Sequence, residues 1–162
     1  MVTSSASLLD SSRADSHNWH MILRLEHAGL SVADLERSIA FYRDYLGMRV
    51  IRVIESGPEM PLGTIVGMPH ATARIAHLEL DGMMLELFEY TSPRGREIPE
   101  DRRQADHGLV HVGFTSTDTR ADYAVLREKG VAFLSEPVEY RPNVWVVYFR
   151  GPDGEVCELR QT

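Results

Sequence analysis

Two histidines and two glutamates stand at equivalent places in an internal repeat of this 162-residue chain. His27 and His111 each begin the pattern His-x-Gly-x-Ser/Thr-x-x-Asp, and Glu86 and Glu158 each follow an Asp-Gly pair in a hydrophobic segment. Imidazole nitrogens and carboxylate oxygens are common ligands of divalent metals. The repeat therefore predicts an N2O2 metal site, provided that the fold brings the four side chains together.

Each of these side chains lies on a strand-like segment whose alternate residues are mostly apolar, so we expect the four faces to point inward. Cys157, next to Glu158, should then point to the opposite face. Buried carboxylates carry a large desolvation cost, which a bound cation offsets. A lone histidine in such a place is more often a hydrogen-bonded core residue, but two histidines and two glutamates at equivalent repeat positions favour a metal site.

The hydrophobic pattern predicts that each half of the chain folds as βαβββ. Asp34 and Asp118 open the predicted helices, and Gly47 and Gly130 end them. The pair Asp81-Gly82 predicts a tight turn between two strands. The predicted strands are 21–32, 48–54, 72–80 and 83–90 in the first half, with an irregular crossing at 55–70, and 109–116, 131–139, 144–150 and a last strand to residue 160 in the second.

These elements divide the chain into two modules. We expect residues 1–20, which are polar and rich in serine, to form a flexible tail without the features of a secretory signal. The first module spans 21–90, a polar linker spans 91–106, and the second module spans 107–162.

Composition restricts the partners of the protein. The 24 acidic and 17 basic residues give a net charge of −7, which argues against nucleic acid and anionic membranes as partners. No apolar segment approaches the roughly 20 residues that a membrane span needs. A single cysteine excludes an intramolecular disulfide and favours a reducing, cytoplasmic location. A small-molecule substrate fits these limits.

From residue 24 to residue 161 the chain resembles the vicinal oxygen chelate superfamily, which comprises glyoxalases, bleomycin-resistance proteins and dioxygenases. Segment 34–48 is especially similar to the first helix of bacterial lactoylglutathione lyases. The resemblance implies an α+β fold of paired βαβββ modules, whose mixed sheets curl into a cleft around one metal ion, and it implies a homodimer. The implied metal ligands are His27, Glu86, His111 and Glu158.

The same resemblance implies a metal-dependent isomerase, epimerase or lyase that transfers a proton next to a metal-bound carbonyl. Glu158 or Glu86 would act as the base, and Glu55 is a second choice because methylmalonyl-CoA epimerases carry an acid near that position. Glu55, Tyr90 and Tyr148 are also candidates for substrate binding. The ligand set leaves the ion open among Zn, Ni, Co, Mn and Fe.

Two other functions compete with this interpretation. Tyr148, ten residues before Glu158, is similar to the signature of Fe(II) ring-cleaving dioxygenases, but a fourth ligand crowds an ion that must also bind dioxygen. An antibiotic-sequestering resistance protein has no reason to keep four ligands. Ser31 stands where lactoylglutathione lyases carry an arginine for glutathione, so the resemblance favours a related reaction on another substrate. Acyl-CoA esters, hemithioacetals, keto-sugars and cyclitols are candidates.

Two further groups of residues have weaker signals. His77 lies on a predicted strand and is interpreted as a structural residue. Several arginines of the linker could attract an anionic substrate, although a solvated linker is the more common reason for such residues. They are Arg94, Arg96, Arg102 and Arg103.

Overall fold

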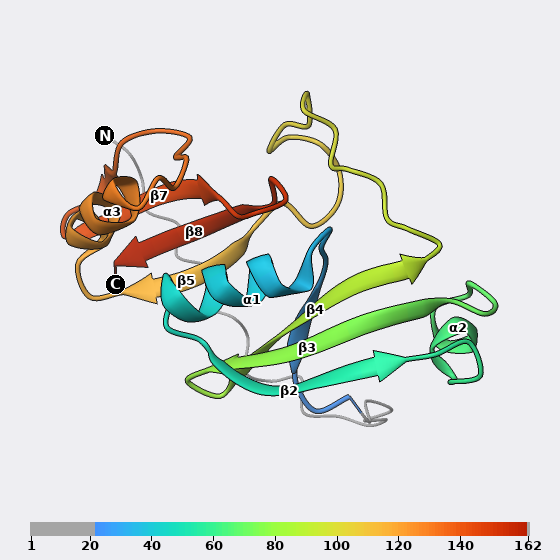
Figure 1. Cartoon of the computed structure of the whole chain (residues 1–162). Helices are drawn as coiled ribbons and strands as arrows, with labels where there is room; N and C mark the ends of the chain where they lie inside the picture. The colour runs from blue at the N-terminus through green and yellow to red at the C-terminus, as the bar shows by residue number, and fades with distance from the viewer. Residues whose placement is uncertain (1–21, 162) are drawn as a thin grey trace, which may run out of the picture.

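The computed structural model describes residues 22–161, which form two four-stranded sheets with helix α1 between them (Figure 1). The strand orders are β1-β4-β3-β2 and β5-β8-β7-β6. The parallel pairs are β1 with β4 and β5 with β8, and the other pairs are antiparallel. The elements are β1 (His27–Ser31), α1 (Leu35–Asp44), β2 (Arg49–Ser56), α2 (Leu62–Ile65), β3 (Thr72–Leu80), β4 (Met83–Ser92), β5 (Val112–Ser116), α3 (Thr119–Glu128), β6 (Val138–Arg141), β7 (Val144–Arg150) and β8 (Val156–Gln161). The predicted α+β fold of paired modules is confirmed, while the predicted tail lies outside the described residues.

Both long helices begin where the sequence predicted. The Asp34 carboxylate accepts a hydrogen bond from the Arg37 N–H at 3.0 Å, and the Asp118 carboxylate caps α3 in the same way. These bonds satisfy N–H groups that have no partner within the helix. Gly47 has a φ of +75°, and its N–H donates to the Arg43 carbonyl at 3.1 Å, which closes the end of α1.

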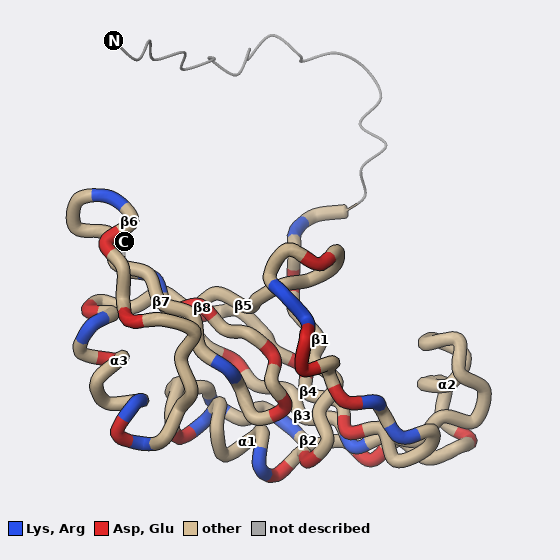
Figure 2. Tube along the Cα trace, turned by 90° about the horizontal axis from the view of Figure 1, so that it is seen from above, with Lys and Arg blue, Asp and Glu red and all other residues tan. Residues whose placement is uncertain are grey.

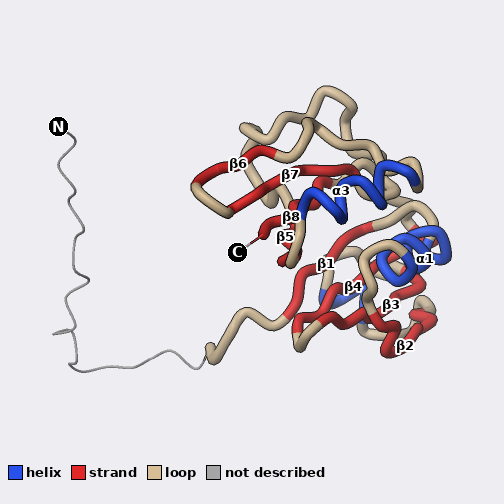
Figure 3. Tube along the Cα trace, turned by 90° about the vertical axis from the view of Figure 1, so that its left-hand side faces the viewer, coloured by secondary structure: helices blue, strands red, loops and turns tan. Residues whose placement is uncertain are grey.

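The turn between β3 and β4 fixes which residues of the two strands face each other. Asp81 and Gly82 have φ angles of +49° and +81°, as a two-residue hairpin turn of the primed type requires. Leu80 is therefore paired with Met83, and the register continues along the strands. Seen from the side in Figure 3, this hairpin belongs to the lower of the two groups of strands.

One hydrophobic core joins the two modules. Leu85 and Leu87 of β4 face this core from the first sheet, and Cys157 and Leu159 of β8 face it from the second. Between them Tyr42 of α1 is fully buried, and its hydroxyl donates to Glu155 Oε1 at 2.7 Å across the junction. A shared core of this kind fixes the relative position of the two sheets.

Some predicted boundaries are wrong. The strand predicted at 131–139 is only Val138–Arg141, because the chain bends at 134–136 and Pro137 has no N–H to donate to a ladder. Before the bend, Phe133 forms an isolated bridge with Phe149. The crossing predicted as irregular contains the short helix α2, and the first strand starts at His27. Among the described residues no helix is both long and apolar enough to cross a membrane.

Candidate metal centre

The first candidate pair comes from neighbouring strands of the first sheet. His27 begins β1, and Glu86 lies on β4 opposite Gly29. The His27 Nε2 atom is 3.3 Å from Glu86 Oε2. The side chain of His27 is 41% exposed and that of Glu86 is 15% exposed. The two groups thus converge on the open face of the sheet.

The second pair repeats this arrangement. His111 directly precedes β5, and its Nε2 atom is 3.2 Å from Glu158 Oε2 on β8. The exposed fractions are 29% and 16%. Gly113 is paired with Glu158, and a Cβ atom at Gly113 would lie 3.4 Å from Glu158 Oε2. The position two residues after the histidine therefore lies in van der Waals range of the carboxylate.

The geometry of both pairs suits a shared cation. Two ligands bound at about 2.1 Å to one ion, with an angle between about 90° and 109°, stand about 3.0–3.4 Å apart. Charge-assisted hydrogen bonds are usually shorter, at about 2.7–2.9 Å. The observed N–O separations of 3.3 and 3.2 Å fall in the first range. Each pair can therefore supply one nitrogen and one oxygen ligand to a divalent ion.

The chain by itself does not bring the two pairs together. Within residues 22–161 no cluster of three or more His, Cys, Asp or Glu side chains is arranged to hold a metal ion. The expectation that the four faces point inward is met only in part. The main core, with Leu85 and Cys157 against α1, lies on the other face of each sheet, whereas the Glu86 face carries a smaller apolar cluster that includes Ile75 and Phe88. The side chains of Glu86 and Glu158 are 15% and 16% exposed. The opposite orientation of Cys157 is as predicted.

Glu26 favours one tautomer of the His27 ring. The His27 Nδ1 atom is 3.0 Å from Glu26 Oε2. A proton on Nδ1 satisfies this contact and leaves the Nε2 lone pair, on the side of Glu86, free to bind a metal. The hydrogen bond to Glu26, with the charge of Glu86, raises the pKa of His27. A metal ion must therefore compete with a proton at this ring.

His77, predicted from the sequence to be structural, contacts the first pair. It is buried on β3 directly opposite Glu86, and its Nε2 atom is 3.1 Å from Glu86 Oε1. Arg52 of β2 donates from Nε to His77 Nδ1 at 3.1 Å. Since Nδ1 accepts this bond, a neutral His77 carries its proton on Nε2, the atom that lies beside Glu86 Oε1. Burial lowers the pKa of His77, and the charge of Arg52 acts in the same direction.

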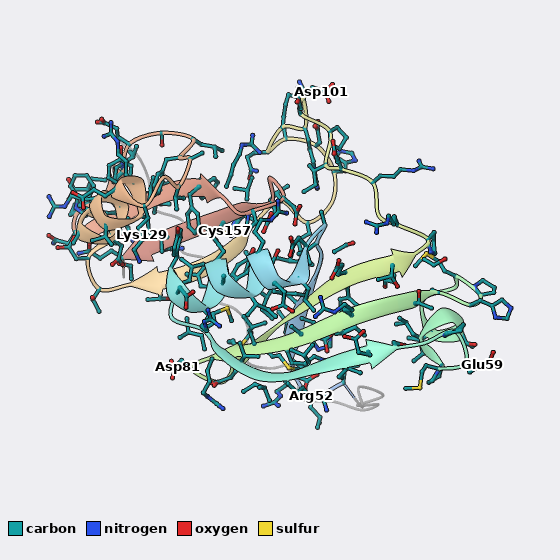
Figure 4. The ribbon with its side chains drawn as sticks, viewed as in Figure 1. Arg52, Glu59, Asp81, Asp101, Lys129 and Cys157 are labelled. Atoms are coloured by element: carbon teal, nitrogen blue, oxygen red, sulfur yellow. The ribbon has the colours of Figure 1, made fainter. Side chains whose placement is uncertain are left out.

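The sequence contained a signal for this contact. A two-residue turn at 81–82 pairs Leu80 with Met83, so each step away from the turn pairs the next two residues. Three steps further, His77 stands opposite Glu86. Figure 4 labels Arg52, the third member of the series, on the side of the first sheet away from α1.

The other candidate residues lie at different places. Tyr148 occupies the position of the second module that matches His77, opposite Glu158, and its ring centre is 5.0 Å from that of His111. Burial and the charge of Glu158 raise the pKa of Tyr148. Tyr90 lies on β4 and stacks on Phe88, with ring centres 5.9 Å apart.

Glu55 is not brought to the candidate centre. Its carboxylate forms an ion pair with Arg74 at 3.0 Å and is largely exposed. Arg74 also binds Glu36 of α1, so this network lies on the helix face of the sheet, opposite to Glu86.

The two carboxylates have different surroundings. Each oxygen of Glu86 lies close to a histidine nitrogen, Oε1 at 3.1 Å from His77 Nε2 and Oε2 at 3.3 Å from His27 Nε2. Glu158 contacts His111 through Oε2, and its Oε1 has no hydrogen-bond partner among the described residues. Glu86 therefore has a histidine beside each oxygen, whereas Glu158 has one beside Oε2 alone.

Comparisons with known proteins agree with this architecture. Residues 24–159 match the model of the Glyoxalase/Bleomycin resistance protein/Dioxygenase superfamily. The chain is similar to human mitochondrial methylmalonyl-CoA epimerase, at 26% identity over 85% of this chain and 73% of that protein. It is also similar to a probable lactoylglutathione lyase of Synechocystis, at 26% identity over 85% of this chain and 95% of that protein.

Among solved structures, a glyoxalase family protein from Bacillus cereus has the same fold. The TM-score is 0.81 at 20% identity, and the match covers 90% of this chain and 98% of that protein. The family model spans most of the chain, and the fold agrees with it. The chain therefore belongs to the Glyoxalase/Bleomycin resistance protein/Dioxygenase superfamily.

Proposed function

We propose that the protein is a divalent-metal-dependent isomerase, epimerase or lyase that moves a proton next to a substrate carbonyl. The observation that carries the proposal is the presence of two His-Glu pairs, each with the N–O separation of two ligands of one ion. A small molecule is the substrate, and the single buried cysteine, Cys157, fits a cytoplasmic protein.

We further propose that a second copy of the chain completes the metal site. The two pairs lie on separate sheets whose relative position is fixed by a shared core, so closure within one chain would break that core. A two-fold dimer can instead join the first pair of one copy to the second pair of the other, and it forms two equivalent sites. The apolar segment before β1 supports such a contact, because Leu23 is 95% exposed and Ile22 and Leu25 are nearly as exposed.

The side chains of this proposed site have different roles. A divalent ion held by His27, Glu86, His111 and Glu158 would polarise a substrate carbonyl as a Lewis acid. We assign the proton transfer to Glu158, because its Oε1 is unengaged among the described residues. Glu86, which has a histidine beside each oxygen, would serve as a permanent ligand. Tyr148 lies beside Glu158 and is positioned to orient a substrate or to donate a hydrogen bond.

Subunit complementation tests both the ligands and the dimer. Chains carrying Glu86→Gln and Glu158→Gln are produced with different tags, singly and together, and mixed dimers are isolated by two affinity steps. Elemental mass spectrometry then measures the metal retained after gel filtration. A matched pair of exposed substitutions, Glu59→Gln and Glu139→Gln, provides the control.

The expected result is about two ions per wild-type dimer, and almost none in either variant alone. The mixed dimer should hold about one, because one of its two sites combines the intact halves of both chains. A mixed dimer as empty as its parents would refute the site between chains. A wild-type protein that takes up no metal after reconstitution would refute the enzyme and favour a metal-free binding protein.

A further inference from the structure

A cavity of about 320 Å³ opens beside His111, where the loop between β4 and β5 crosses the junction of the two modules. Figure 1 shows this loop rising above both sheets, and Figure 2 looks down on it. The cavity is bounded by the loop, by β1, by the residues before β5 and by the turn before β8. Its volume is at the lower end of the range for small-molecule sites.

The charged side chains of this cavity are mainly basic. Its lining includes Arg96, Arg102, Arg103 and Arg150, and the acid among its lining residues is Glu155. This concentration is unexpected in a chain whose net charge is −7. A basic cavity in an acidic protein attracts anions locally, against the field of the whole molecule.

Most of this positive charge is not neutralised by neighbours. Glu155 is already engaged, since it accepts hydrogen bonds from the Tyr42 hydroxyl at 2.7 Å and from the Asp153 N–H at 2.9 Å. Arg103 forms an ion pair with Asp106 at 3.0 Å and is therefore compensated.

The other three arginines retain donors for a ligand. Arg102 and Arg150 each use one guanidinium nitrogen, to the carbonyls of Leu109 and Gly154, at 2.8 and 2.9 Å. These main-chain bonds hold the two side chains in place without cancelling their charge. Arg96 has no hydrogen bond or ion pair to another described residue. A planar guanidinium with free N–H groups matches phosphate and carboxylate oxygens in a two-point contact.

We propose that this cavity binds an oxyanion group, a phosphate ester or a carboxylate, through Arg96, Arg102 and Arg150. His111 forms part of its wall, so a ligand anchored here extends toward the candidate metal centre. The anion would then be the tail of the substrate whose carbonyl end reacts. Only this last identification rests on the proposed function, because anion binding itself requires no metal.

Isothermal titration calorimetry on the full-length protein tests the cavity directly. The protein is first treated with a chelator and freed of it by gel filtration, so that the result does not depend on the metal site. Pyrophosphate and malonate serve as probes of the two oxyanion types, at an ionic strength fixed near 0.1 M because exposed charges are screened by salt. The test variant is Arg96→Ala/Arg102→Ala, and Arg141→Ala on β6 is the control, since this exposed arginine lies outside the cavity lining.

We expect at least one probe to bind wild type and Arg141→Ala equally, and to bind the double variant at least about tenfold more weakly. Tighter binding of pyrophosphate than malonate would indicate a phosphate ester, and the reverse order a carboxylate. Equal affinity of the double variant and wild type would overturn the proposal, as would the absence of binding of both probes at about 10 mM. Anion binding is measured on metal-free protein, so a failure of the proposed metal site would not change this result. The anion-binding proposal and the proposed function can therefore be refuted independently.

Discussion

Replacement of His77 by leucine tests whether the buried Arg52–His77–Glu86 series supports the metal centre. Leucine fills a similar volume but presents no N–H group to Glu86 Oε1, which His77 Nε2 approaches to 3.1 Å. Glu86 then keeps only its contact with His27 and gains freedom to rotate away from the ion. We therefore expect His77→Leu to weaken metal binding although His77 is not itself a ligand.

The structure sets the size of this effect. The lost polar contact joins two groups with little solvent access, since the side chains of His77 and Glu86 are 8% and 15% exposed. A hydrogen bond formed here to the charged Glu86 would contribute at most about 1.5–3 kcal/mol. If all of it is lost from the bound state, the metal Kd rises by about 10- to 150-fold. In general, substitution of a group that orients a metal ligand lowers metal affinity by about 10- to 100-fold, which agrees with this range.

Metal affinity is measured by competition with a chromogenic chelator for Zn²⁺ at constant pH, so the assay needs no substrate. His77→Gln is the informative companion, because its amide can donate to Glu86 and accept from Arg52. We expect it to recover most of the affinity. His107→Gln, at an exposed position of the loop, controls for the removal of a histidine, and thermal unfolding of the metal-free proteins confirms that all of them fold.

Two results would contradict this reasoning. If His77→Leu binds Zn²⁺ within about twofold of wild type, while Glu86→Gln does not bind, the contact from His77 has no role in the site. If His77→Gln is as weak as His77→Leu, the volume and shape of the ring matter, and its hydrogen bonds do not.

Three further predictions concern buried groups. Tyr42→Phe removes the donor to Glu155 at the module junction and should lower the free energy of unfolding in urea by about 1.5–3 kcal/mol, whereas Tyr45→Phe, at a more exposed site, should change it little. Burial raises the pKa of the Cys157 thiol to about 12, so native protein should not react with a thiol reagent at pH 8 and unfolded protein should react fully. Burial also lowers the pKa of His77 from 6.5, so the unfolded chain takes up this proton at higher pH than the folded protein does. Metal-free wild type should therefore lose more stability than His77→Leu as the pH falls below about 6.5, which urea titrations across this range can measure.

Much of the fold could be predicted from local patterns. Asp34 and Asp118 cap helices because a short acidic side chain satisfies free N–H groups wherever a helix begins. Asp81-Gly82 forms the predicted turn because few other pairs accept two positive φ angles. The strand predicted at 131–139 was wrong because its apolar residues are interrupted by a bend before Pro137.

The candidate site was predictable as two pairs. Within one sheet, strand alternation and the parallel pairing of β1 with β4 bring His27 beside Glu86, and the repeat does the same for His111 and Glu158. The contact between His77 and Glu86 was missed, although it depends on hairpin register alone. Residues that depend on a single turn are therefore within reach of sequence reasoning.

The sequence by itself determined the repeat, the helix caps, the hairpin turn and the types of the metal-binding side chains, because each depends on residues close together in the chain or on alternation along one strand. The tertiary structure decided which face of each sheet packs against α1. Helix α1 covers Leu85 and Cys157, so Glu86 and Glu158 lie on the opposite faces of separate sheets. It also decided that Arg96 and Arg150, which are 54 positions apart, line one cavity. Both features depend on how residues far apart in the chain pack against each other. A local sequence pattern does not show which hydrophobic surface of one module will contact the other.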